Sequence, residues 1–136
     1  MCEKAASAIC TVYSIGKLLE LPPEKRSVTI FDVPIKRRRV LCSTEDPAKE
    51  FISADFCPKN TRLLVTASAK GDFKIVIWNW DKQRMLHYFD LSIPRHCTVD
   101  QVSFSNIDPT VVVVTGDDLY RYLKSEGTSP VLKLIN

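Results

Sequence analysis

The residues whose side chains could do chemistry are few, and their spacing does not favour a catalytic or metal site. Five cysteines are present: Cys2, Cys10, Cys42, Cys57 and Cys97. No two of them have the C-x-x-C spacing that zinc sites and redox pairs commonly use. We therefore expect free thiols in a reducing compartment.

The histidines and the paired carboxylates do not assemble a reactive site either. His87 and His96 are the only histidines, and His96 precedes Cys97. Neighbouring residues on a strand point to opposite faces, which argues against a Cys–His nucleophile pair. Asp117 and Asp118 could do acid–base work, but they follow a glycine, where turn formation explains them. We expect no catalytic residue, no metal, no cofactor and no enzymatic activity.

The sharpest charge feature is the basic run Lys36, Arg37, Arg38 and Arg39, which is a candidate interaction patch. Positive charge on an outermost strand discourages edge-to-edge pairing, and this structural interpretation is the one we favour. An acidic protein surface such as a tubulin tail is a second interpretation. Nucleic acid is a third, weakened because no aromatic platform accompanies the run.

The composition is that of a soluble globular chain and gives no general case for a nucleic-acid or membrane partner. The 136 residues are 45% hydrophobic and 26% charged, with a net charge of +3. Apolar runs such as 111–114 are far too short to span a bilayer. The N-terminus lacks the charged-then-apolar pattern of a secretory signal. We expect a cytoplasmic protein.

The elements that carry these residues are predicted to be twelve short strands in three groups of four. The first group is 7–13, 17–21, 26–33 and 37–42; the second is 50–57, 62–68, 73–80 and 84–91; the third is 98–105, 110–115, 118–124 and 130–135. Alternating apolar residues bounded by Pro, Gly, Asn and Asp predict each strand. A helix over 1–13 is an alternative for the first segment.

A short pattern recurs through these groups, because an apolar strand ends in an aromatic residue three times. Phe31, Trp78 and Tyr122 lie 47 and 44 residues apart, which is the period of a four-stranded propeller blade. The blade-like units are approximately 7–42, 50–91 and 98–135. Trp78 and Trp80 share one strand face, and we expect at least one of them to be buried between blades.

The residues that carry a family resemblance lie mainly in the second and third groups. They are Ala54–Asn60, Leu63–Thr66, Ile77–Gln83 and Val99–Phe104. Together they resemble a WD-repeat propeller and, more narrowly, the N-terminal propeller of the cilia- and flagella-associated protein 57 family, over roughly 26–136. The fold class is therefore all-β, with about three four-stranded antiparallel blades of an incomplete WD40-type β-propeller. Its open blade faces would need self-association or a partner, or mark a truncated chain.

The sequence departs from the usual WD pattern, since Asn79 follows Trp78 and no Gly-His pair is present. The Asp-His-Ser/Thr-Trp hydrogen-bond network of that family is thus expected to be incomplete. The resemblance implies a non-enzymatic scaffold in the assembly or structure of motile cilia or flagella. Its partners would be axonemal or tubulin-associated proteins, with no small-molecule substrate, and its location the axoneme. The alternatives are a general cytosolic interaction module or a truncated isoform without independent function.

Overall fold

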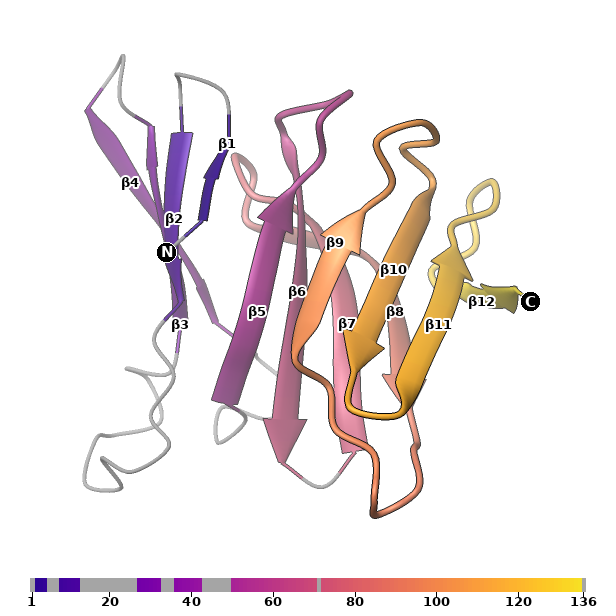
Figure 1. Ribbon diagram of the computed structural model, residues 1–136. Helices are drawn as coiled ribbons and strands as arrows, with labels where there is room; N and C mark the ends of the chain where they lie inside the picture. The colour runs from indigo at the N-terminus through magenta and orange to yellow at the C-terminus, as the bar shows by residue number, and fades with distance from the viewer. Residues whose placement is uncertain are drawn as a thin grey trace.

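The computed structural model describes residues 2–4, 8–12, 27–32, 36–42, 50–70 and 72–135, which form twelve strands in three four-stranded antiparallel sheets (Figure 1). The first sheet holds β1 (Cys2–Lys4), β2 (Ala8–Val12), β3 (Ser27–Asp32) and β4 (Arg37–Cys42). The second holds β5 (Glu50–Phe56), β6 (Leu63–Lys70), β7 (Asp72–Asn79) and β8 (Arg84–Leu91). The third holds β9 (Gln101–Phe104), β10 (Val111–Gly116), β11 (Leu119–Lys124) and β12 (Lys133–Ile135). The predicted all-β class of antiparallel blades is confirmed.

The first segment differs from the prediction in two ways. β1 lies ahead of residue 7 and was not predicted, and together with β2 it shows that the helical alternative for 1–13 is wrong. The strand predicted at 17–21 lies outside the described residues. β1 pairs with β2 through Glu3 opposite Ile9, which gives the first sheet its fourth strand.

Each sheet is a meander in which every strand pairs with the next one along the chain. The sheets stand side by side in chain order, and the first strand of the second sheet, β5, contacts both β1 and β9 (Figure 1). The first strands therefore lie on the inside of the stack, and the last strands β4, β8 and β12 lie at the opposite sheet edges. This arrangement is that of consecutive propeller blades.

Two apolar cores fill the spaces between the sheets. Between the first and second sheets lie Val28, Ile30, Leu41, Phe51, Phe56, Leu64, Val76, Trp78 and Trp80. Between the second and third lie, among others, Val65, Ala67, Ile75, Ile77, Val102, Phe104, Val112, Val114 and Leu123. Buried side chains of β6 and β7 contribute to both cores, because each face of the second sheet meets a neighbouring sheet. Burial of each large side chain stabilises the stack by about 1.5–3 kcal/mol.

A β-bulge in β5 changes which residues share a face. The pairing register with β6 shifts between Phe51 and Ser53. Strict alternation would place Phe51 on the face of Ser53 and Asp55, but Phe51 instead joins Phe56 in the core against the first sheet. Ile52 packs toward the third sheet. Simple alternation therefore does not hold at the start of β5, because an extra residue at the bulge inverts the faces beyond it.

The register also corrects the aromatic repeat in the third sheet. Leu64 is paired with Trp78 in the second sheet, and the corresponding Val112 is paired with Leu123 in the third. Leu123 is fully buried, whereas Tyr122 points to the other face and is 36% exposed. The hairpin of β10 and β11 is shorter between these paired positions, since Leu123 follows Val112 by 11 residues (123 − 112) whereas Trp78 follows Leu64 by 14 (78 − 64).

The outer edge of the second sheet is covered by the chain segment that precedes β12. The backbone N–H of Tyr88 on β8 donates to Pro130 O at 2.8 Å, and the N–H of Leu132 donates to Tyr88 O at 2.8 Å. The side chain of Leu132 is buried in the core between the second and third sheets. A covered edge cannot template pairing with another chain, and here it also ties two sheets together.

Candidate interaction surfaces

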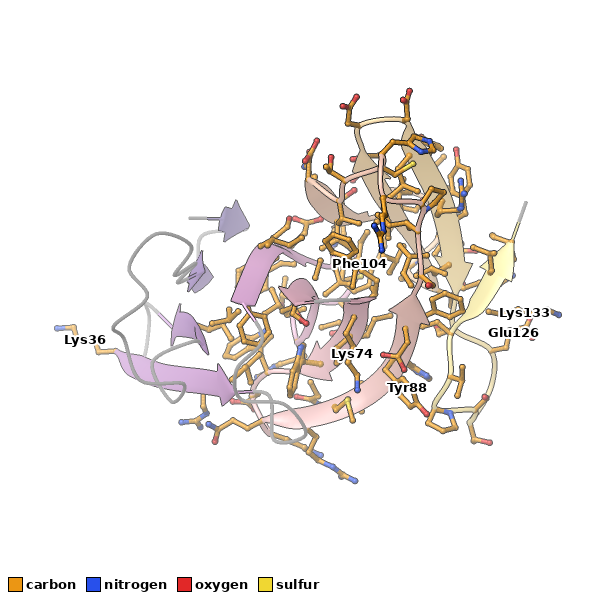
Figure 2. The ribbon with its side chains drawn as sticks, turned by 90° about the horizontal axis from the view of Figure 1, so that it is seen from below. Lys36, Lys74, Tyr88, Phe104, Glu126 and Lys133 are labelled. Atoms are coloured by element: carbon orange, nitrogen blue, oxygen red, sulfur yellow. The ribbon has the colours of Figure 1, made fainter. Side chains whose placement is uncertain are left out.

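The basic run lies on β4, at the outer edge of the first sheet, but its members have different environments. Lys36 precedes the strand with a φ of 52°, is exposed and points away from the molecule (Figure 2). Arg39 is half-buried, and its Nε donates to Asp81 O at 3.1 Å. Of Arg37 and Arg38 the structure describes the backbone, which pairs with Asp32 and Phe31 of β3. The edge position agrees with the structural interpretation of the run, while Arg39 is engaged by the second sheet.

Asp81 is the carboxylate that joins the first two sheets, and the sequence analysis did not single it out. Its Oδ2 lies 2.6 Å from Arg62 Nη1, and its Oδ1 lies 3.7 Å from Arg39 Nη2. Arg62 also lies over the ring of Trp80, 6.0 Å from its centroid, and Trp80 Nε1 donates to Thr61 O at 2.6 Å. Ion pairs between side chains as exposed as these each stabilise the fold by about 0.2–1 kcal/mol. The cluster therefore contributes more to the alignment of the two sheets than to the stability of the fold.

At least one of Trp78 and Trp80 was predicted to be buried between blades, and both are, Trp78 at 7% and Trp80 at 4% exposure. Trp78 Nε1 donates to the buried hydroxyl of Thr66 at 2.9 Å. The corresponding positions of the third sheet hold Val114 and Leu123, which cannot form this bond. The third sheet therefore replaces a hydrogen-bonded pair with apolar packing, in agreement with an incomplete network.

The inner strands of the second and third sheets are linked by two side-chain-to-backbone hydrogen bonds. β9 is the edge strand of its sheet, so its outward N–H groups have no strand beside them. Ser53 Oγ accepts from the N–H of Val102 at 3.2 Å, and Asp55 Oδ2 accepts from the N–H of Phe104 at 3.1 Å. Two polar residues at alternate positions of the inner strand, Ser53 and Asp55, are the sequence signal for this link, which was not predicted.

The candidate reactive residues do not come together. His96 is exposed in a turn and Cys97 is buried, with its Sγ donating to Asp118 O at 3.5 Å. Asp117 and Asp118 are exposed in the turn between β10 and β11, where Asp118 has a φ of 54°. Within the described part of the chain, no group of three or more His, Cys, Asp or Glu could hold a metal ion.

Two titratable groups of the third sheet have shifted pKa values. Asp108 accepts from the hydroxyl and the N–H of Thr110, and these bonds hold the pKa of its carboxyl below the usual value. Tyr120 and Tyr122 lie edge to face with centroids 5.1 Å apart. A hydrogen bond with Tyr120 raises the pKa of Tyr122, with burial of its hydroxyl as a smaller cause. This aromatic pair lies on the face turned away from the second sheet.

Comparison with known proteins identifies one protein that is similar in sequence and two solved structures that are similar in fold. The chain is 31% identical over 121 residues to cilia- and flagella-associated protein 57 from Mus musculus, a region covering 86% of this chain and 9% of that protein. No protein-family model matches the chain. The chain thus spans about one-eleventh of the length of this relative.

The solved structures are β-propellers. The propeller domain of Cps50 (Swd1) from Myceliophteria thermophila superposes with a TM-score of 0.59 at 14% identity, covering 80% of this chain and 32% of that one. A chain of the mitotic checkpoint complex gives a TM-score of 0.62 at 16% identity, covering 83% and 33%. In the ranges that the structure describes, no helix has the length and apolarity needed to cross a membrane. The chain thus has the fold of a partial β-propeller and is similar in sequence to cilia- and flagella-associated protein 57.

Proposed function

We propose that this chain is a non-enzymatic protein-interaction scaffold in the assembly or structure of motile cilia or flagella. The observation that supports this proposal is the 31% identity to cilia- and flagella-associated protein 57 across 86% of the chain. Its partners are proposed to be axonemal or tubulin-associated proteins. Its proposed location is the axoneme and the surrounding cytoplasm.

The geometry supports binding through surfaces rather than catalysis. Asp117 and Asp118 are held by a turn, and Cys97 is buried away from the exposed His96. General acid–base or nucleophilic catalysis needs such groups to converge on one reacting atom. What the stacked sheets offer instead is a rigid set of turns and strand edges, the kind of surface that scaffolds present to several proteins.

Lys36 is the proposed point of contact with an acidic protein surface. Its side chain is exposed at the outer edge of the first sheet and points outward (Figure 2). Arg39 takes part in the cluster around Asp81 instead, so its replacement would disturb the packing of two sheets. A charge reversal at Lys36 therefore tests the surface without removing a contact between the sheets.

The function is tested by tagging the full-length protein with a proximity-labelling enzyme in ciliated cells. We expect the label along the axoneme, retained after detergent extraction, and axonemal or tubulin-associated proteins among the labelled partners. Lys36→Glu should reduce retention on extracted axonemes, whereas the matched reversal Lys82→Glu, in an exposed turn of the second sheet, should not.

A uniform cytosolic signal in ciliated and non-ciliated cells alike would contradict the ciliary assignment. That outcome would favour the second candidate function, a general cytosolic interaction module. The structural similarity to a chain of the mitotic checkpoint complex is the reason for naming this second candidate, because that chain has the same fold in a different assembly.

A further inference from the structure

A cavity of about 220 Å³ opens between the second and third sheets. Four apolar side chains line it: Leu63 of β6, Ile77 of β7, Leu86 of β8 and Pro109 of the turn before β10. Of these residues, Ile77 is almost fully buried and Leu86 is exposed. The two sheets that form it pack on a shared core, so the cavity is part of the folded stack.

The size of the cavity fits one side chain better than a complete small molecule. A dry apolar cavity of about 150 Å³ is known to accept a benzene-sized group. Pockets for drug-sized ligands are commonly about 300–1,000 Å³. The cavity in this chain lies between these limits, which suits a single Leu- or Met-sized side chain presented by a partner.

The charge at the cavity is positive. Lys59 is exposed and is the one permanently charged residue among those lining the cavity in the described chain. Asn60 Oδ1 accepts from the N–H of Arg62 at 3.1 Å, which leaves the Asn60 amide N–H groups as donors. His87 Nδ1 lies 2.8 Å from Ser129 O, a carbonyl oxygen that accepts its proton, so this donor is already used within the chain. A partner carboxylate at this opening would accept hydrogen bonds from Lys59 and the Asn60 amide and would complement the charge of Lys59.

We propose that this cavity binds an aliphatic side chain of a partner peptide, with an acidic residue next to it that contacts Lys59. The proposal deepens the scaffold function and rests on it, because it names the chemistry of one partner segment. The apolar wall provides most of the affinity, and the charge provides orientation and preference.

The test uses the full chain with methyl groups labelled for NMR and three short capped peptides as probes. The first contains Leu followed by Asp, the second Ala followed by Asp, and the third Leu followed by Lys. We expect the Leu-Asp peptide to shift the methyl signals of Leu63, Ile77 and Leu86 saturably. The Ala-Asp peptide should bind at least about tenfold more weakly, the scale for withdrawing one leucine side chain from water. The Leu-Lys peptide should bind about two- to fivefold more weakly, the scale for an exposed ion pair.

Two protein variants, each with a matched control, make the test specific. Leu86→Ser should weaken the binding of the Leu-Asp peptide about tenfold, whereas Met85→Ser should leave this binding unchanged. Met85 is comparably exposed on the same strand but does not line the cavity. Lys59→Glu should reverse the preference between the Leu-Asp and Leu-Lys peptides. Lys82→Glu, exposed and outside the cavity, should leave the preference unchanged.

The proposal is overturned if the Leu-Asp peptide causes no saturable shifts at these methyl groups, or if Leu86→Ser and Met85→Ser behave alike. It is also overturned if Lys59→Glu keeps the original preference. These failures would leave the scaffold function standing whenever the full-length protein still labels axonemal partners. Loss of axonemal labelling together with intact peptide binding would contradict the ciliary function and leave the cavity assignment intact.

Discussion

The carboxylate of Asp55 accepts a hydrogen bond from the backbone N–H of Phe104, at 3.1 Å and from a neighbouring sheet. Ser53 does the same for Val102 two residues away, at 3.2 Å. The outward N–H groups of an edge strand are thereby satisfied without a further strand. Partly buried donors left without acceptors would destabilise the fold.

We therefore expect Asp55→Ala to lower the free energy of unfolding by about 1.5–3 kcal/mol, the scale of a hydrogen bond to a charged group. Asp55→Asn keeps an acceptor oxygen and should cost less. Urea denaturation of the variants measures both effects. Asp90→Ala, at an exposed carboxylate of β8, is the control. Equal stability of Asp55→Ala and the parent would show that the bond does not hold the sheets.

Trp78 and Tyr122 should respond very differently to truncation, because the register places Leu123 and not Tyr122 at the position of Trp78. Trp78→Ala should lower the free energy of unfolding by about 3–5 kcal/mol, because it leaves a cavity in the core. Tyr122→Ala should cost less than about 1 kcal/mol. Thr66→Val should cost about 1–3 kcal/mol, since it leaves the buried Trp78 Nε1 without its acceptor. Thermal and urea unfolding decide the order, and similar losses at positions 78 and 122 would contradict the register.

Gly116 is required because another segment crosses it closely. A Cβ at this position would lie 1.6 Å from the backbone oxygen of Thr98, so the segment before β9 would have to move. We expect Gly116→Ala to cost about 3 kcal/mol, at the upper end for overpacking. Gly127→Ala meets open space but has a φ of +52°, and should cost only about 1 kcal/mol of backbone strain. If the two variants unfold alike in urea, the close crossing at Thr98 is absent.

The lowered pKa of Asp108 makes the stability of the fold depend on pH. In the folded chain the pKa of this carboxyl is lowered, chiefly by the Thr110 hydroxyl. The stabilisation that it provides is therefore present above the unfolded pKa and is lost as pH falls through the folded pKa. Thr110→Val removes the hydroxyl bond but keeps the backbone one. We expect it to move the pKa of Asp108 up toward its ordinary value, measured by carboxyl-carbon NMR titration. Thr128→Val, at an exposed loop residue, should not; an unchanged pKa in Thr110→Val would contradict the assignment.

The strands of the second and third sheets follow from local sequence because apolar alternation and turn residues define them directly. Arg84–Leu91 forms as predicted, and the valines of β10 occupy an interior strand. Apolar residues lie on both faces of β7, as the position of the second sheet between the other two requires. These are the features that propensity and periodicity control.

Other features depend on how the sheets meet, which a single sequence does not show. The bulge at Phe51 and the one-residue offset of Tyr122 change faces without changing composition. The contacts of Asp81 with Arg62 and Arg39 join residues far apart in the chain. The cavity beside Leu86 exists only once the second and third sheets are packed.

The second and third sheets are joined as consecutive blades through their inner strands. The decisive experiment is amide hydrogen exchange at Val102 and Phe104, followed by NMR in the folded chain. We predict slow exchange at both amides in the parent, and faster exchange at Phe104 than at Val102 in Asp55→Ala. Exchange of both amides at the rate of an unprotected chain in the folded parent would contradict this connection, because an edge strand with no acceptor beside it would then stand alone.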